Sequence, residues 1–155
     1  MKKEVKTMTH ENFRPYGTYI TWEEIDKLND PVNFYKEDSL VDKSDCPLTA
    51  VTLQGVSPRP RVVAMSEYHN DTEEIYGGFE DDVVMHVGLP SDTPHAENIE
   101  LFLLPAGAYC RIKRKVWHMA PFALGDKRLH GIVILPPYTY THDCFVFPLD
   151  EEITF

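Results

Sequence analysis

The sequence predicts an all-β domain, either a β-sandwich or a barrel, and three observations support this fold class. Short runs rich in β-branched or aromatic residues follow one another from Leu48 to the end of the chain. Turn-forming residues separate these runs, as at Gly77-Gly78 and Pro136-Pro137. The 12 prolines suit loops and strand ends better than helix interiors. Many short strands with almost no helix are typical of sandwiched or closed sheets.

One short helix is expected before the strands begin. Thr21 and Glu24 form a capping box, in which each satisfies part of the first helical turn. The helix is expected over residues 22–29, because the residue before Pro31 disfavours helical backbone. The strands are expected at Leu48–Leu53, Val62–Tyr68, Glu74–Tyr76, Val83–Val87, Ile99–Leu104, Tyr109–Ile112, Gly131–Leu135, Phe145–Phe147 and Ile153–Phe155. We therefore expect one domain over residues 1–155, with an N-terminal extension at 1–47 and the barrel at 48–155.

Composition excludes several classes of partner. The chain has 155 residues, enough for one sizeable core, and 15 basic against 25 acidic side chains give a net charge of −10. Such a chain repels phosphate backbones and anionic lipid head groups, so neither nucleic acid nor a membrane is expected as a partner. The N-terminus has no apolar run of the kind a secretory signal carries, and a cytoplasmic location is the default expectation. Cys46, Cys110 and Cys144 lie far apart and are interpreted as reduced structural thiols.

Four side chains are the strongest candidates for chemistry. Glu67 and His69 are two residues apart in an expected strand and so share one face, and Glu74 begins the next strand after a tight loop. These three groups can converge across an antiparallel pair, and His118 follows a later short strand. Glu67, His69, Glu74 and His118 are an N/O ligand set that suits zinc, manganese, iron or nickel. Without a metal, the same groups supply a base, an acid and an orienting partner.

Four short segments lie in order along the chain, and the second and third contain Glu67, His69 and His118. They are Phe13-Arg14-Pro15-Tyr16-Gly17, Glu67-Tyr68-His69, Val116-Trp117-His118 and Asp143-Cys144. The spacing of His69, Glu74 and Trp117-His118 resembles the two sequence motifs of the cupin superfamily. Within it, the chain looks most like the ureidoglycolate lyase family, whose corresponding segments are F-x-P-[FY]-G, E-R-H, G-V-W-H and N-D-C. The resemblance implies a cupin jelly-roll β-barrel with a site inside the barrel mouth, and it implies a homodimer.

Three positions depart from the family pattern. Glu74 stands where the family usually has Gln, which makes the cluster more anionic and more favourable for a metal ion. Glu67 stands where metal-binding cupins have their first His. Lys115 stands where the family has Gly, so we expect the turn with positive φ to be remodelled there. The pattern therefore lies between a metal-free lyase site and a metallocupin site.

Five further residues are candidates for substrate contact. If His118 faces inward, strand alternation places Arg114 nearest the pocket, where its guanidinium can clamp a substrate carboxylate, and Arg61 is the alternative clamp. The other interpretation of residues 111–115 is a solvated basic face. Tyr76, His86 and Trp117 are candidate pocket residues. Trp117 is interpreted as a core or pocket-wall aromatic rather than a catalytic group, and His86 as either a satisfied core histidine or a pocket lining.

The function implied by the resemblance is cleavage of ureidoglycolate to glyoxylate and urea, a step of allantoin degradation in purine metabolism. His69 or His118, oriented by Glu67, suits the role of base because imidazole titrates near neutral pH. Two alternatives remain: a metal-dependent cupin isomerase or epimerase acting on a sugar or sugar acid, and a non-catalytic cupin that binds a small molecule. We expect a small carboxylate as ligand and no organic cofactor. A divalent ion is predicted at Glu67, His69, Glu74 and His118, because two ionised carboxylates in a barrel interior otherwise repel each other.

Overall fold

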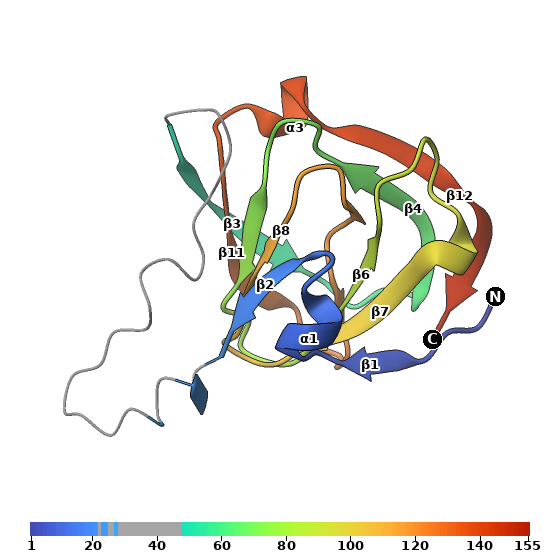
Figure 1. Cartoon of the computed structure of the whole chain (residues 1–155). Coiled ribbons are helices and arrows are strands. Elements are labelled where there is room, and N and C mark those ends of the chain that lie inside the picture. The colour runs from blue at the N-terminus through green and yellow to red at the C-terminus, as the bar shows by residue number, and fades with distance from the viewer. Residues whose placement is uncertain (22, 25–26, 28–47) are drawn as a thin grey trace.

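The computed structural model describes residues 1–21, 23–24, 27 and 48–155, and in these residues the chain forms two β-sheets with only short helices (Figure 1). Sheet A has seven strands: β1 (Val5–Thr7), β4 (Val62–Tyr68), β6 (Val83–Gly88), β7 (Ile99–Leu104), β9 (Trp117–His118), β10 (Phe122–Ala123) and β12 (Phe145–Thr154). Sheet B has five strands: β2 (Gly17–Ile20), β3 (Ala50–Val56), β5 (Glu74–Gly77), β8 (Tyr109–Ile112) and β11 (Leu129–Leu135). The helices are α1 (His10–Phe13), α3 (Thr139–His142) and the 3-10 turn η1 (Ala96–Asn98).

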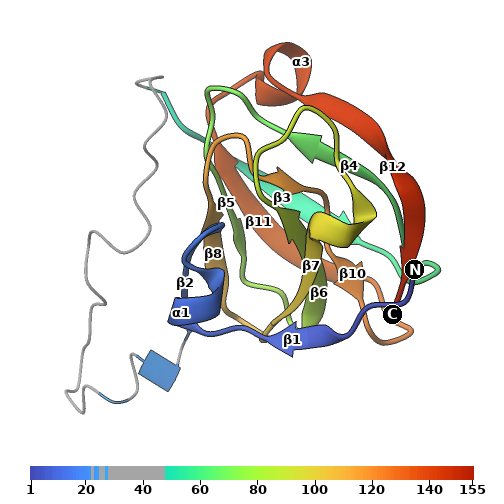
Figure 2. The same cartoon turned by 45° about the vertical axis from the view of Figure 1, so that its right-hand side comes forward.

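Sheet A curls strongly, and its two ends approach each other. Its strand order is β1-β7-β6-β9-β4-β12, with β10 paired to β6. The backbone N–H of Lys3 donates to the carbonyl of Thr154 at 3.0 Å, and the N–H of Thr154 donates to the carbonyl of Met1 at 2.8 Å. Both termini therefore lie at the same edge, where β12 meets the start of the chain (Figure 2). The strand order of sheet B is β2-β8-β5-β11-β3, and this sheet packs against one face of sheet A.

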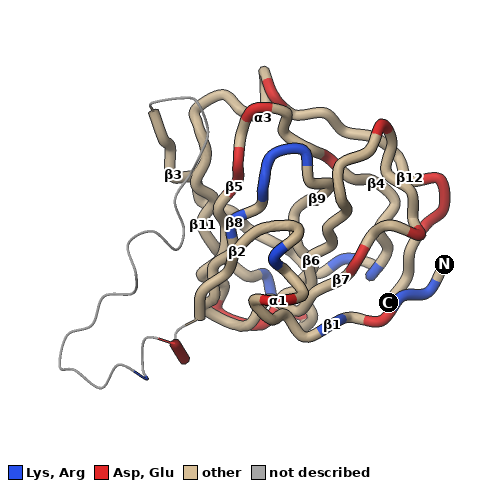
Figure 3. The backbone as a smooth tube through the Cα atoms, in the orientation of Figure 1, with Lys and Arg blue, Asp and Glu red and all other residues tan. Residues whose placement is uncertain are grey.

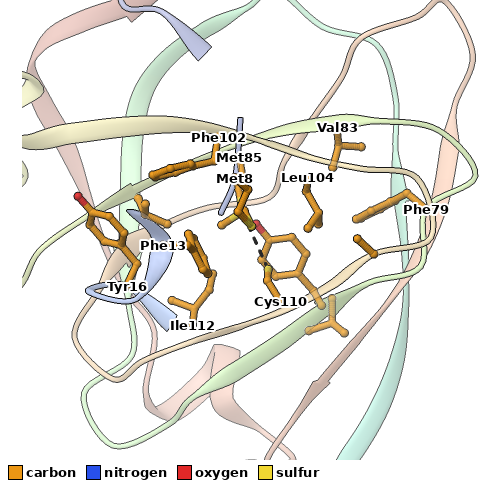
Figure 4. Close-up of a cluster of buried hydrophobic side chains, with 14 of the residues drawn as sticks. Met8, Phe13, Tyr16, Phe79, Val83, Met85, Phe102, Leu104, Cys110 and Ile112 are labelled. Atoms are coloured by element: carbon orange, nitrogen blue, oxygen red, sulfur yellow. Dashed lines mark hydrogen bonds between the residues drawn. The ribbon is translucent and has the colours of Figure 1, made fainter. Parts of the chain in front are cut away.

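The curled sheet has an apolar core on each face because residues of a strand alternate between its faces. Val83, Met85 and Val87 of β6 belong to the larger core, which lies between the two sheets and includes Phe13 of α1 (Figure 4). Val84 belongs to the second core. The second core is drawn from sheet A and η1: Val63, Val84, Ala96, Ile99, Leu101, Trp117, Phe122 and Ile153. Sheet A thus lies between two apolar cores, and on β6 the alternation of side chains decides which core a residue enters.

The predicted all-β class is confirmed, and two sheets with one curled into a half-barrel are consistent with a cupin-like jelly roll. The strands predicted at 62–68, 99–104 and 109–112 have the observed bounds. The last two predicted strands are one continuous strand, β12, whose pairing with β4 shifts between Pro148 and Ile153. The short strands β9 and β10 were not predicted, because two residues carry no periodic signal.

The N-terminal segment departs from the prediction. β1 pairs in parallel with β7, and β2 pairs with β8, so strands ahead of residue 48 belong to both sheets rather than to an extension. A short helix that was not predicted, α1, begins at a capping box formed by Thr9 and Asn12. Most of the helix predicted at 22–29 lies outside the described residues; at its start, the Thr21 N–H donates to Glu24 Oε2 at 3.1 Å, as a capping box requires. Of the three cysteines, Cys46 also lies outside, and Cys110 and Cys144 are free thiols.

Candidate functional site

Both sheets contribute to the cluster of predicted ligands. On sheet A, Glu67 of β4 lies opposite His118 of β9, and His118 lies opposite Val87 of β6, a residue of the core between the sheets. On sheet B, Glu74 is the first residue of β5 and lies opposite Ile112, which belongs to the same core. Paired residues share a face, so Glu67, His118 and Glu74 all face the space between the sheets.

The fourth residue, His69, follows β4 directly and completes a buried cluster. His69, His118 and Glu74 are 1%, 2% and 5% exposed. One ligand atom from each of Glu67, His69 and His118 can be chosen so that all three lie within 4.8 Å of one another. Glu74 Oε2 lies 3.2 Å from His69 Nε2 and 3.9 Å from His118 Nε2. The structure therefore brings together all four residues predicted as metal ligands, with Glu67, His69 and His118 forming the triad that can hold an ion.

Backbone carbonyls fix the orientation of both imidazoles. His69 Nδ1 lies 2.8 Å from the carbonyl oxygen of Asp143, and His118 Nδ1 lies 2.8 Å from that of Val116. A carbonyl only accepts, so each Nδ1 carries the hydrogen and donates it. Each Nε2 is then the nitrogen that faces the cluster. In the part of the chain that the structure describes, the buried Nε2 of His118 has no hydrogen-bond partner. Imidazoles that bind metals are commonly oriented in this way.

The electrostatics of the cluster favour a positive charge at its centre. Burial acts to raise the pKa of Glu74, but the neighbouring His118 and His69 outweigh burial and bring the pKa of this carboxyl down to about 2. Burial acts to lower the pKa of His118, but Glu74, Glu67 and the Val116 carbonyl raise it above its ordinary value. Two imidazole nitrogens thus face two carboxylates. Protons on the nitrogens or a divalent cation on their lone pairs can supply the balancing charge.

A cap over the cluster is formed by α3 and the residues that follow it. The carboxylate of Asp143 accepts the backbone N–H groups of Asn70 at 2.8 Å and Asp71 at 3.0 Å, which holds the loop after His69 in place. Cys144 Sγ donates to Glu67 Oε2 at 3.2 Å. The ring centroid of Tyr140 lies 6.1 Å from that of His69.

Tyr140 is the site residue that the sequence analysis missed. Its side chain is about half exposed, and burial together with the nearby Glu74 and Glu67 raises the pKa of its hydroxyl well above the usual value. The hydroxyl therefore lies close to both carboxylates, at the exposed side of the cluster. The Asp143-Cys144 segment, which the resemblance includes, was the signal that this part of the chain lies near the site.

The turn between β8 and β9 borders the cluster on another side. The backbone N–H of Lys115 donates to the carbonyl of His69 at 2.7 Å. Lys115 has φ of 63°, so the left-handed turn expected for Gly is kept with a lysine in place, and the remodelling that we expected does not occur. Arg114 is the neighbouring residue in this turn, and it remains the candidate carboxylate clamp. Figure 3 shows this basic turn next to the acidic start of β5.

The other predicted contact residues lie elsewhere. Arg61 precedes β4, whereas Glu67 is near its end, about 20 Å further along a strand that rises about 3.3 Å per residue. The Arg61 guanidinium donates instead to the carbonyl of Leu124 at 2.7 Å. Trp117 alternates with His118 and packs in the second core, where its Nε1–H donates to Ser91 Oγ at 2.9 Å. The structure therefore does not place Arg61 or Trp117 at the cluster.

His86 and Tyr76 also have clear positions. His86 alternates with Val87, so it faces away from the cluster, and its Nε2 lies 3.0 Å from Ser66 Oγ. Tyr76 is two residues after Glu74 on β5 and shares its face, but it is 1% exposed and belongs to the core between the sheets. Tyr76 is therefore a neighbour of the cluster on its buried side.

No family model matches the chain, and no curated protein matches it. No helix among residues 1–21, 23–24, 27 and 48–155 has the length and apolar character needed to cross a membrane. The structure shows a mostly β domain of two sheets that is consistent with a cupin-like jelly roll, and its Glu67, His69 and His118 could hold a metal ion.

Proposed function

We propose that this protein is a metal-dependent cupin-type lyase that cleaves ureidoglycolate to glyoxylate and urea. One observation carries the proposal: two buried imidazoles, each fixed through Nδ1 on a backbone carbonyl, present Nε2 to a pair of carboxylates. A surface histidine or a satisfied core histidine does not need this arrangement. His118 Nε2 has no hydrogen-bond partner among the residues that the structure describes, and a ligated cation would satisfy it.

The donor set fits a first-row divalent ion. Glu67, His69 and His118 would hold it, with Glu74 as the fourth group beside them. Imidazole and carboxylate donors suit zinc, manganese, nickel or iron rather than a soft ion that prefers thiolates. Such an ion, when bound, supplies Lewis-acid polarisation of a substrate oxygen.

The residues of the chain supply the proton transfers of this reaction. The substrate hydroxyl loses its proton as the carbonyl of glyoxylate forms, the C–N bond breaks, and the departing urea nitrogen gains a proton. Glu74 Oε2 lies next to both imidazoles but outside the triad, and in this proposal it would take the hydroxyl proton and return it to the nitrogen. A positioned group of this kind contributes about 10²–10⁴ in rate. Tyr140, at the exposed side, would orient the leaving group.

The carboxylate of the substrate requires a cation. Arg114 lies in the turn whose next residue binds the His69 carbonyl, so its backbone is close to the cluster, whereas Arg61 precedes β4 at its far end. An arginine can hold a carboxylate with two parallel hydrogen bonds. We infer that Arg114 is the clamp.

A second candidate is favoured by Glu74 itself. A carboxylate at this position, rather than an amide, suits a metal-dependent isomerase or epimerase that moves a proton on a sugar or sugar acid. A third, a cupin that binds a small carboxylate without turnover, uses the same cluster without proton transfer.

The test is an assay of the purified chain with (S)-ureidoglycolate, with glyoxylate followed after loading with zinc, manganese, nickel or iron in turn. Metal-dependent release of glyoxylate, lost in Glu74→Gln and kept in the surface variant Glu152→Gln, supports the lyase. Glyoxylate no faster than the uncatalysed rate in every metal state refutes it. Turnover of a sugar acid instead supports the isomerase, and saturable binding without turnover of either supports the third function.

A further inference from the structure

Asp143 bonds to three separate parts of the candidate site. Its backbone N–H donates to the carbonyl of Thr139 at 2.8 Å, at the end of α3. Its own carbonyl accepts from His69 Nδ1 at 2.8 Å. Its two carboxylate oxygens accept the backbone N–H groups of Asn70 and Asp71, at 2.8 and 3.0 Å. Figure 2 shows α3 leading into β12, so this residue lies where the cap joins sheet A.

The two imidazoles of the triad are held by acceptors of different origin. His118 Nδ1 donates to the carbonyl of Val116, which is two residues earlier in the same segment. His69 Nδ1 donates to the carbonyl of Asp143, which is 74 residues further along the chain. A change that moves the Asp143 backbone therefore disturbs the acceptor of His69 and leaves the acceptor of His118 in place.

The carboxylate of Asp143 fixes the position of this distant carbonyl. Asn70 and Asp71 follow His69 directly, so the side chain of Asp143 binds the backbone just after the ligand while its carbonyl binds the ring of the ligand. Hydrogen bonds from backbone N–H groups to an ionised carboxylate are roughly twice as strong as neutral ones. Without these two bonds, one neutral bond between the carbonyl and the ring would remain.

The orientation of the ring decides whether His69 can serve as a ligand. Its Nε2 lies 3.2 Å from Glu74 Oε2, on the side of the ring that faces the cluster. Rotation of the ring about its Cβ–Cγ bond would turn Nε2 away, and the bond from Nδ1 to the Asp143 carbonyl opposes this rotation. The same bond keeps a hydrogen on Nδ1, so Nε2 is the nitrogen that can offer a lone pair to an ion.

We propose that Asp143 is a positioning residue of the metal site. It holds the imidazole of His69 in the orientation that binds a divalent ion, and it links this ligand to the cap that carries Tyr140. The inference rests on the ion of the proposed function, but it does not depend on the substrate. Coupling between two sites is reciprocal. An ion on His69 should therefore also stabilise the bonds that Asp143 makes to Asn70 and Asp71.

The first test compares the zinc affinity of two matched variants by calorimetric titration. Asp143→Asn keeps the size of the side chain but replaces one accepting oxygen by an NH₂ group, which only donates. Asp150→Asn is the control, because Asp150 also accepts a backbone N–H, from Ala96 at 2.8 Å, and its other oxygen lies 2.9 Å from His95 Nδ1. We expect zinc affinity to fall by about tenfold in Asp143→Asn, as for other residues that orient a ligand, and to be unchanged in Asp150→Asn.

The second test separates positioning from a general loss of structure. NMR of the metal-free protein follows the Nδ1 protons of His69 and His118, both of which are hydrogen-bonded in the wild type. In Asp143→Asn we expect the Nδ1 proton of His69 to exchange with water and lose its signal, while the Nδ1 proton of His118 is retained. A variant that is merely less well folded would lose both.

The third test uses the wild-type chain, so it holds even if Asp143→Asn fails to fold. Hydrogen exchange reports the local opening of single backbone N–H groups. We expect zinc to slow the exchange of the Asn70 and Asp71 amides, because the ion and the Asp143 bonds stabilise each other.

Three results would overturn the proposal: equal zinc affinity in Asp143→Asn and Asp150→Asn, ring protons of His69 and His118 that respond alike, or Asn70 and Asp71 amides that zinc does not protect. None of the three measurements involves turnover. A chain whose zinc affinity depends on Asp143 but which releases no glyoxylate loses the lyase assignment and keeps this inference. A chain that releases glyoxylate with zinc affinity independent of Asp143 does the reverse.

Discussion

His118 and His86 lie on opposite faces of one sheet, and their environments have opposite effects. Both imidazoles are at least 98% buried, and each has one ring nitrogen without a hydrogen-bond partner in the described structure. Yet the pKa of His118 is raised above its ordinary value, whereas that of His86 is lowered to about 3. The two residues are joined through Ser66, which contacts the ring of one and the backbone of the other.

The difference comes from carboxylates and not from burial. Burial acts to lower the pKa of both histidines, but Glu74 and Glu67 face His118, and in the described part of the chain no carboxylate is among the groups that shift the pKa of His86. A buried imidazole without a carboxylate beside it remains neutral. A buried imidazole beside two carboxylates requires a cation. The following variants test this contrast, beginning with the one that should have the largest effect.

Replacing His118 by Ala should remove metal binding almost completely. Changes to residues that merely support a ligand commonly cost 10–100-fold in affinity, so loss of the ligand itself should exceed about 100-fold. Calorimetric titration with zinc measures it. The control is His130→Ala, since His130 is an exposed histidine that pairs with Glu80 at 3.1 Å. Zinc affinity that is unchanged in His118→Ala would show that the ion binds elsewhere.

Replacing Glu74 by Gln should weaken metal binding less, by about 10–100-fold, while the fold is retained. The exchange is nearly isosteric, but it removes one of the two charges that face the imidazoles. Zinc titration and the midpoint of thermal unfolding check both parts. Glu152→Gln, at an exposed position, carries the same charge change away from the site. If both variants bind zinc equally well, Glu74 does not contribute to the cation site.

His86 should make the free energy of unfolding depend on pH. Its pKa is about 3 when folded against an ordinary 6.5, so between these values the unfolded chain binds more protons. The free energy of unfolding should therefore fall as the pH is lowered from about 6.5 toward 3, by at most about 1.4 kcal/mol per pH unit. Arg59 and His118 add to this by repelling a charge on the ring.

In His86→Gln that part of the slope should vanish, because glutamine does not titrate. Urea unfolding of the wild type and the variant at pH 7, 6 and 5 in the presence of chelator measures the difference. Parallel pH profiles for the two proteins would contradict a neutral, buried His86.

The smallest effect concerns the turn beside the cluster. Lys115 holds a left-handed backbone, at φ of 63°, that costs a residue with a side chain about 1 kcal/mol relative to glycine. Lys115→Gly should therefore raise the free energy of unfolding by up to about 1 kcal/mol, partly offset by the greater freedom of the unfolded chain. Lys115→Ala keeps the strain and is the control. A glycine variant no more stable than the alanine variant would contradict this account of the turn.

The sequence predicted the local part of the site well. Glu67, His69 and Glu74 belong to one strand–loop–strand segment, so their spacing alone placed them near one another. The spacing did not reveal the cap, because the carbonyl that orients His69 is 74 residues away at Asp143. The resemblance pointed to Asp143-Cys144, yet no pattern distinguished Tyr140 from other loop aromatics.

The predicted positions were wrong where they depended on which face of a strand a residue occupies or on how far along the strand it lies. The sequence placed Trp117 next to His118, and only the pairing of β9 shows that the two face different interiors. Arg61 is near Glu67 in sequence, but the extended strand β4 separates the two residues in space. The strands β1 and β2 were missed because their pairing partners, β7 and β8, lie far along the chain. Long-range pairing is not encoded in local alternation.

The most direct test of the central claim is X-ray absorption of the zinc-loaded protein, which reports the atoms bound to the metal. Cys144 Sγ lies 3.2 Å from Glu67 Oε2, so a thiolate is close enough to compete with the predicted ligands. We expect one zinc per chain, with nitrogen and oxygen ligands alone at about 2.0–2.2 Å and the scattering pattern of two imidazoles. A sulfur ligand at about 2.3 Å, or a chain that retains no zinc, would contradict the assignment of the ion to Glu67, His69 and His118.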